Sequence, residues 1–247
     1  MTNAKRSIGR AVPAIIAACL LAWPAVTHAA STKPKEHSFA TKPLGMTISI
    51  RMVGPYSEPA DLQMICFFKH KPSGDTYLGA AKETDDSLRG VLSSLRDHGE
   101  FVGELGETIL LTPPRGMIPA KQFMVIGLGE EANLSLDTLR LVGRIAAREA
   151  VRLRAKRVAW APVIRDQGNS SIDVGEGDRA FTEQMLSAYA TEKRLQKTGF
   201  APAFSIERFV IETGPTYFDG VVEQVNAGIS AWDAQSKSSP SKPENQL

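Results

Sequence analysis

The sequence predicts an α/β fold: a three-layer α/β/α sandwich with a mixed, largely parallel sheet. Two observations predict it. From Leu88 onward, short apolar runs typical of buried strands alternate with longer segments that carry their apolar residues on one face, as helices do. The apolar runs also end at Gly or Pro, which are the strongest turn signals. Strands that alternate with helices favour a sheet that lies between helical layers.

Six segments are predicted as strands. Residues 46–53 alternate Ile with Thr and Ser, the period of a half-buried strand. Residues 123–126 are continuously apolar and end at Gly127-Leu128-Gly129, as expected of a buried strand closed by a turn. The other predicted strands are residues 62–68, 107–111, 158–161 and 206–211.

Four segments are predicted as helices. In residues 84–99 the apolar side chains share one helical face, and Gly99 ends the segment. In the longest helix, residues 135–156, apolar residues share one face and four arginines recur on the opposite face. The other predicted helices are residues 181–195 and 221–232, and the acidic, Gly-rich residues 173–178 are predicted as a loop.

Residues 1–29 have the pattern of a secretory signal peptide. Three basic residues and no acid precede an apolar run that extends from Ala11 to Trp23, and small residues follow it. We therefore expect cleavage after Ala29 and a periplasmic or secreted protein. An alternative is a lipoprotein anchored at Cys19, because Ile16-Ala17-Ala18-Cys19 resembles a lipobox. The apolar run continues past Cys19, which favours cleavage after Ala29.

The remaining chain is predicted to contain one folded domain. Residues 30–45 are rich in Lys, Pro, Ser and Thr and are expected to be a flexible leader. Residues 46–232 form the predicted α/β domain, and the polar residues 233–247 are expected to be a disordered tail. No apolar run after the signal peptide is long enough to cross a membrane, so we expect no transmembrane segment.

The charge balance argues against a nucleic-acid-binding protein. Without residues 1–29 the chain carries 26 Lys and Arg against 27 Asp and Glu, a net charge near −1. A dedicated polyanion binder would be strongly basic. Arg140, Arg144, Arg148 and Arg152 could grip phosphates, but they lie opposite the apolar face, where a solvated surface is expected. We therefore expect no nucleic-acid partner.

Candidate ligand-binding and catalytic residues are few. Gly127 and Gly129 follow a strand and precede a helix, so their backbone N–H groups could bind a phosphate of a cofactor. Glu130 and Glu131 place negative charge there, however, and a tight turn explains the same glycines, so we expect no bound cofactor. Cys66 lies in an apolar run and is expected to be a buried, unreactive thiol. No metal-ligand spacing occurs, and the carboxylates at Asp85 and Asp173 suit helix capping better than a cation site.

Two motifs and their order resemble a known family. Phe101-Val102-Gly103-Glu104-Leu105-Gly106-Glu107 precedes a strand and a Pro-rich loop, and Phe123-Met124-Val125-Ile126-Gly127-Leu128-Gly129 and a long Arg- and Ala-rich helix follow. This resembles the N-terminal domain of the leucyl aminopeptidases of peptidase family M17, and Glu183 to Tyr189 is similar to a later helix of that domain. The resemblance implies a macro-domain-like fold.

The family's catalytic domain has no counterpart in this sequence. In the family that domain holds two divalent metals and a catalytic Arg in an N-T-D-A-E-G-R segment, which does not occur here. No catalytic or metal residue is therefore transferred to this chain.

Three functions are consistent with this resemblance. We expect an exported, non-catalytic binding or assembly module that has a protein partner or forms a homo-oligomer. Alternatives are an accessory subunit that joins a separate catalytic chain of the family, and a nucleotide- or ADP-ribose-binding domain.

Overall fold

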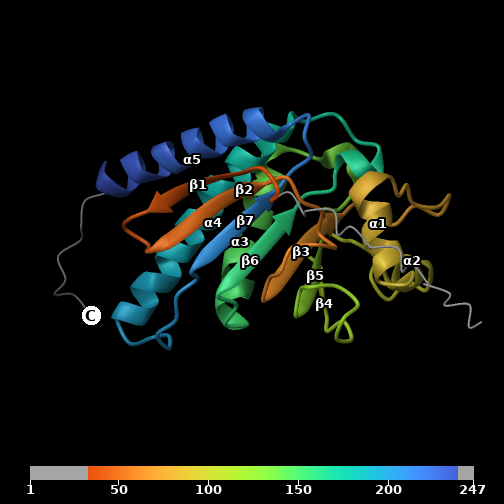
Figure 1. Cartoon of the computed structure of the whole chain (residues 1–247), viewed down its shortest axis with the longest axis horizontal. Coiled ribbons are helices and arrows are strands. Elements are labelled where there is room, and N and C mark those ends of the chain that lie inside the picture. The colour runs from red at the N-terminus through yellow and green to blue at the C-terminus, as the bar shows by residue number, and fades with distance from the viewer. Residues whose placement is uncertain (1–32, 239–247) are drawn as a thin grey trace, which may run out of the picture. The chain divides into compact units, whose positions relative to one another are not determined.

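The protein, seen here as a computed structural model that describes residues 33–238, contains a single seven-stranded sheet in that part of the chain (Figure 1). The strand order is β1-β2-β7-β6-β3-β5-β4. The predicted signal peptide and the possible lipidation site at Cys19 lie outside the described residues. The strands are β1 (Glu36–Thr41), β2 (Met46–Arg51), β3 (Leu62–Phe67), β4 (Thr108–Leu111), β5 (Gln122–Gly127), β6 (Arg157–Ala161) and β7 (Arg208–Glu212).

The centre of the sheet is parallel and its two edges are antiparallel. β2, β7, β6, β3 and β5 run parallel to their neighbours. β1 pairs with β2 and β4 pairs with β5 in antiparallel registers. The prediction of a mixed, largely parallel sheet is confirmed.

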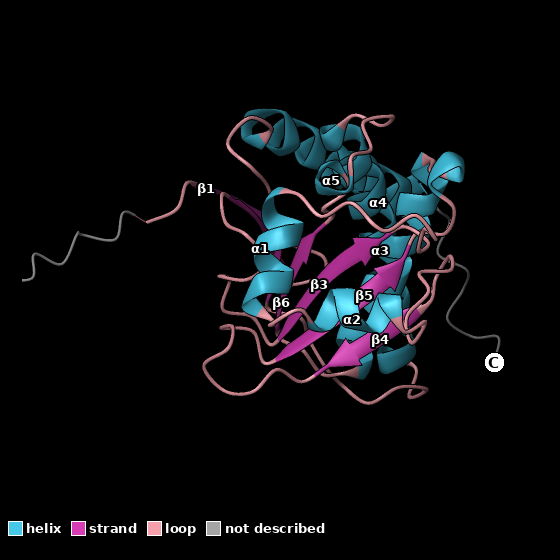
Figure 2. Cartoon of the chain, turned by 90° about the vertical axis from the view of Figure 1, so that its right-hand side faces the viewer, coloured by secondary structure: helices cyan, strands magenta, loops and turns pink. Residues whose placement is uncertain are grey.

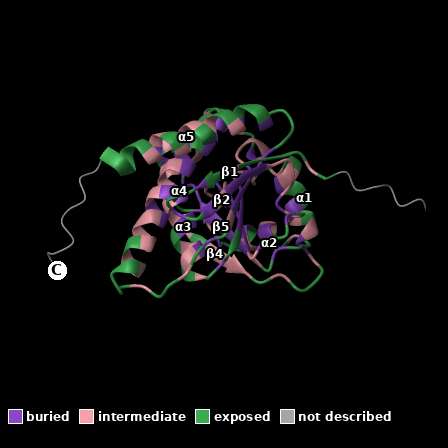
Figure 3. Cartoon of the chain, turned by 60° about the vertical axis from the view of Figure 1, so that its left-hand side comes forward, coloured by how far each residue is buried: buried purple, intermediate pink, exposed green. Residues whose placement is uncertain are grey.

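Helices cover both faces of the sheet, so the fold has three layers. Figure 2 shows α1 and α2 in front of the strands, with α3, α4 and α5 behind them. Side chains alternate between the two resulting cores: on β3, Met64 and Cys66 pack with α3 to α5, and Ile65 and Phe67 pack with α1 and α2. Figure 3 shows buried strands beneath helices whose outer sides are exposed. The helices are α1 (Gly79–Ser87), α2 (Val91–Asp97), α3 (Leu136–Arg152), α4 (Val174–Lys197) and α5 (Phe218–Ser238).

The ends of the domain extend beyond the predicted bounds. β1 lies within residues 30–45, where we predicted a flexible leader. Most of its side chains are exposed, so its composition resembles that of a linker, but all six of its residues are in register with residues of β2. At the other end, α5 continues past Trp232 to Ser238, into the predicted tail.

Residues 84–99 form parts of two helices instead of the single one predicted. Arg89 and Gly90, with φ of 58° and 75°, make a left-handed turn that separates α1 from α2. The Asp85 side chain closes the turn, because its Oδ1 accepts from the backbone N–H groups of Leu92 at 2.9 Å and Ser93 at 3.2 Å. The apolar face continues across the break, which is why the sequence pattern resembled one helix.

The predicted loop at residues 173–178 is wrong, because α4 already begins at Val174. Asp173 caps the helix: its Oδ1 accepts from the Glu176 N–H at 3.0 Å. Gly175 and Gly177 are helical, and each lies where a neighbouring side chain comes close. A Cβ atom on Gly177 would lie 2.8 Å from Leu139 Cδ1. These glycines therefore permit close packing, although their spacing resembled that of a loop.

Candidate functional site

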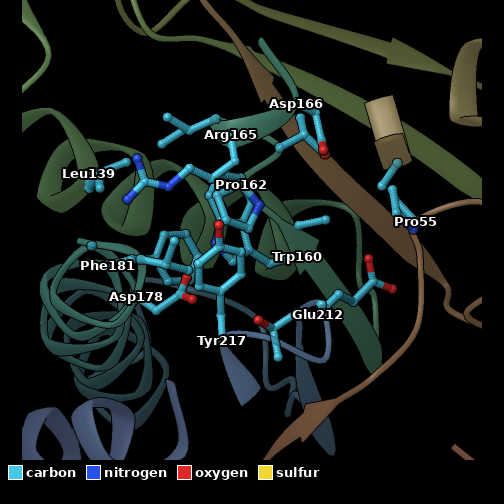
Figure 4. Close-up of a pocket in the computed structure, with 18 of the residues that line it drawn as sticks. Pro55, Leu139, Trp160, Pro162, Arg165, Asp166, Asp178, Phe181, Glu212 and Tyr217 are labelled. Atoms are coloured by element: carbon cyan, nitrogen blue, oxygen red, sulfur yellow. The ribbon is translucent and has the colours of Figure 1, made fainter. Parts of the chain in front are cut away.

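A largely apolar pocket lies where β6 and β7 end, at the carboxyl edge of the parallel strands (Figure 4). Its volume is about 260 Å³. Ligands of open α/β sheets bind outside the carboxyl ends of their strands, where loops can converge without disturbing the sheet. The apolar lining comprises Val53, Pro55, Ala80, Leu139, Trp160, Ala161, Pro162, Val163, Ile164, Ile172, Val174 and Phe181.

The Gln167 side chain fixes the loop that follows β6. Its Oε1 accepts from the Phe68 N–H at 2.8 Å, and its Nε2 donates to the carbonyls of Cys66 at 3.0 Å and Val163 at 3.1 Å. Val163 itself is buried with a φ of 43°, a conformation rarely adopted by a β-branched residue. The loop after β6 is therefore held in one shape at the rim of the pocket.

Cys66 lies under this loop and is buried, as predicted. Its Sγ donates to the Pro162 carbonyl at 2.7 Å. Burial raises the pKa of the Cys66 thiol well above its usual value, and the charge of Asp178 raises it further. A thiol held in its protonated form is a poor nucleophile, so Cys66 acts as part of the core.

Asp178 brings a buried carboxyl group from α4 to the pocket. The residue is 2 % exposed, and its Oδ2 has no hydrogen-bond partner. Burial raises the pKa of Asp178 to about 7, and the neighbouring Trp160 side chain opposes part of that shift. The Trp160 ring stacks on Phe181, with 4.6 Å between the ring centroids. A buried acid with one unpartnered oxygen therefore lies beside an aromatic wall.

Glu212 brings a second buried acid, from the end of β7. It is 3 % exposed; its Oε2 accepts from Gln63 Nε2 at 3.0 Å, and its Oε1 has no partner. Burial raises the pKa of Glu212 well above its usual range, although the hydrogen bond from Gln63 opposes this. In Figure 4 the Asp178 and Glu212 side chains lie on either side of Tyr217. The adjacent Thr213 is also buried, and its hydroxyl has no partner.

The other charged side chains of the lining already have partners. Arg165 donates through Nη2 to the Ile172 carbonyl at 2.8 Å and through Nη1 to the Asn169 carbonyl at 3.2 Å. Asp166 accepts from backbone N–H groups at the start of α1, and Asp173 caps α4. The unpartnered carboxyl oxygens of the lining are therefore those of Asp178 and Glu212.

Gly127 and Gly129, the candidate binding residues, lie away from this pocket at the end of β5. Their backbone N–H groups donate to the carbonyls of Glu107 at 2.7 Å and Gly103 at 2.9 Å, respectively. A Cβ atom on Gly127 would lie 2.0 Å from the Glu104 carbonyl oxygen, so the side chain is absent where two segments touch. Their role in binding a cofactor stays a prediction.

The arginine stripe of α3 is engaged within the helical layer. Arg140 pairs with Asp137 at 2.8 Å, Arg152 pairs with Glu149, and Arg144 donates to Gln184 at 2.9 Å. Arg148 is exposed. This arrangement suits the solvated helix face that the sequence predicts.

Two features are absent from the described part of the chain. Residues 33–238 contain no group of three or more His, Cys, Asp or Glu side chains placed to hold a metal ion. In the same range, no helix has the length and apolar character that crossing a membrane requires.

The sequence matches known proteins over the centre of the chain. Residues 65–193, just over half of it, match the profile of the cytosol aminopeptidase family, N-terminal domain. A probable cytosol aminopeptidase of Alkaliphilus oremlandii is 36% identical over 95 residues, which is 38% of this chain and 19% of that protein. One of Geotalea uraniireducens is 38% identical over 112 residues, which is 45% of this chain and 22% of that protein. The matches thus span about a fifth of the length of these curated relatives.

Solved structures of two kinds share the fold. A mutant of tomato leucine aminopeptidase aligns with a TM-score of 0.52 and 18% identity, over 80% of this chain and 38% of that one. A macrodomain of Oceanobacillus iheyensis with ADP aligns with a TM-score of 0.55 and 10% identity, over 81% of this chain and 100% of that one. The macro-domain-like fold is therefore confirmed. Because the family profile covers more than half of the chain, this protein belongs to the cytosol aminopeptidase family and carries its N-terminal domain.

Proposed function

We propose that this chain is a non-catalytic binding module that takes a small ligand in the pocket at the carboxyl edge of β6 and β7. The observation that carries the proposal is the pocket itself. It is mostly apolar and contains a few converging polar groups with unused hydrogen-bonding capacity, which is the usual make-up of a small-molecule site. The buried oxygens of Asp178 and Glu212 lack partners, and a ligand would supply them.

A nucleotide or ADP-ribose fits this pocket poorly. Its lining contains four carboxylic acids, Asp166, Asp173, Asp178 and Glu212, against the single cation Arg165. A diphosphate would find no free cation there, because the Arg165 Nη atoms already donate to carbonyls. The volume of about 260 Å³ also lies below the roughly 300–1,000 Å³ that is usual for drug-sized ligand sites. We therefore favour a smaller ligand without phosphate.

A second candidate is assembly with a separate catalytic chain of the same family. Membership of the cytosol aminopeptidase family, whose N-terminal domain the chain carries, favours this candidate. A catalytic aminopeptidase of the family that co-purifies with the chain from its native host, and gains activity from it, would support assembly. Repeated recovery of the chain without such a partner would oppose it.

The binding proposal is tested with the purified chain. In a nitrogen–proton NMR screen of small fragments of varied charge, we expect hits that shift the indole signal of Trp160 and leave that of Trp232 unchanged. Leucyl-p-nitroanilide with added Mn²⁺ or Zn²⁺ should not be hydrolysed. Metal-dependent hydrolysis would contradict the non-catalytic role, and a screen in which no fragment shifts Trp160 would contradict the binding role.

We also propose that the chain is exported, on the strength of the basic, apolar and small-residue pattern of residues 1–29. Expression in a bacterial host followed by mass spectrometry of the periplasmic fraction should identify Ala30 as the mature N-terminus. A lipid-modified N-terminus at Cys19 in the membrane fraction would favour the lipoprotein alternative. An intact N-terminus in the cytoplasm would overturn export.

A further inference from the structure

Most of the unpartnered polar atoms of the pocket can accept a hydrogen bond, and the Trp160 Nε1 is the donor among them. The acceptors are Asp178 Oδ2, Glu212 Oε1 and the Thr213 hydroxyl oxygen, on residues that are 2 %, 3 % and 8 % exposed. Burying a carboxyl oxygen without a partner costs free energy, which a donor brought by a ligand would recover. Unpartnered acceptors therefore outnumber unpartnered donors in the lining, so a ligand that supplies donors suits the pocket.

The charge of the lining points to a cationic donor. The Arg165 Nη atoms are used by backbone carbonyls, and Asp166 and Asp173 are used by helix N-termini. The Oδ2 atom of Asp178 has no hydrogen-bond partner, and no cation of the lining is paired with the Asp178 carboxyl group. An ammonium group placed there would gain a charge-assisted hydrogen bond in surroundings from which water is largely excluded.

The shape of the pocket limits the rest of the ligand. The stacked rings of Trp160 and Phe181 and a set of aliphatic side chains form the walls, so the body of the ligand should be apolar. Aromatic faces also attract a nearby cation. The volume of about 260 Å³ restricts the buried body to a single ring or a short branched chain.

We propose that the pocket binds a small hydrophobic amine, with its ammonium group against Asp178 and its apolar body against Trp160 and Phe181. This inference rests on the proposed binding function and specifies its ligand class. Glu212 and Thr213 supply further acceptors for the remaining ammonium hydrogens or for a second donor on the ligand.

Three probes that share one apolar body test the ligand class on the unaltered protein. Phenethylamine, 2-phenylethanol and phenylacetate present a cationic, a neutral and an anionic head group. By calorimetric titration at pH 7.5, phenethylamine should bind at least about tenfold more tightly than 2-phenylethanol, because its ammonium adds a charge-assisted bond. Phenylacetate should bind most weakly, and binding should shift the Trp160 indole signal.

Two matched variants distinguish the effect of Asp178 on amine binding from the effect of other acidic residues nearby. In Asp178→Asn the tenfold preference for the amine over the alcohol should be lost. Glu176→Gln removes an exposed carboxylate from the same helix, two positions before Asp178 and outside the pocket lining, so it should retain the preference. Circular dichroism establishes that both variants are folded, and the probe series on the unaltered protein needs neither of them.

The failures of the two proposals are distinguishable. If the alcohol or the carboxylate binds as tightly as the amine, the amine proposal is overturned and the binding function stands. If none of the three probes shifts Trp160, the amine proposal is overturned as well. The fragment screen, which samples other shapes, then decides separately whether the pocket binds ligands.

Discussion

Replacing Asp178 by asparagine is expected to stabilise the protein at pH 8. The free energy of unfolding of the variant should exceed that of the unaltered chain by an amount that grows as the pH rises from 4 to 8. Burial raises the pKa of Asp178 to about 7, so the folded state keeps a proton that the unfolded state has lost above pH 3.8. Stability therefore falls as the pH rises through this window, by up to about 4 kcal/mol for a shift of this size. Asparagine has nearly the same shape and no charge to bury. Urea unfolding at pH 4, 6 and 8 measures the difference.

Asp61 supplies a control, because its pKa is shifted in the opposite direction to that of Asp178. Burial alone would raise its pKa, but hydrogen bonds from the Lys121 side chain and from the backbone and side chain of Arg157 lower it to about 2. Asp61 therefore stabilises the fold above pH 3.8, and this contribution is lost as the pH falls towards 2. Asp61→Asn should cost stability at neutral pH, and the cost should shrink in acid. A gain for Asp178→Asn that does not change with pH would contradict the buried, protonated acid.

The sequence predicts the fold well because its strongest signals are local. Each central strand is a short apolar run, and the run of β3 alternates between two cores that are both apolar. Strand β1 was missed because its side chains are mostly exposed, so no apolar pattern marks it. It owes its order to backbone pairing with β2, a partner that composition does not reveal.

The pocket could not be predicted from the sequence, because segments that lie far apart in the chain form it. Trp160 on β6, Asp178 on α4 and Glu212 on β7 meet because β6 and β7 are parallel neighbours and α4 packs across them. A weak signal was present, since Glu212 directly follows an apolar run, where a buried acid is unusual. Asp178 was assigned to a loop because Gly175 and Gly177 were interpreted as loop residues. The same property of glycine, its lack of a side chain, instead brings helices together.

Replacing Gly143 by alanine is expected to destabilise the fold strongly, because Gly143 marks the contact between α3 and α4. A Cβ atom at this position would lie 2.3 Å from the Phe181 carbonyl oxygen and 3.1 Å from the Met185 backbone nitrogen. Both are backbone atoms in α4, so the two helices would have to move apart. We expect a net loss of about 1–3 kcal/mol, even though alanine favours the helix by up to about 1 kcal/mol. In thermal unfolding the midpoint temperature Tm should fall by roughly 2–4 °C for each kcal/mol of lost stability.

Two further glycines make this prediction a graded series. A Cβ atom on Gly220, in α5, would have no neighbour within 4 Å, so Gly220→Ala should be neutral or gain up to about 1 kcal/mol from helix propensity. A Cβ atom on Gly228, where α5 meets α4, would lie 3.2 Å from the Arg179 carbonyl oxygen, and a small shift would relieve this contact. Stability should therefore decrease in the order Gly220→Ala, Gly228→Ala, Gly143→Ala. Equal stabilities for the three variants would mean that α3 and α4 do not touch at Gly143, because helix propensity alone treats the three positions alike.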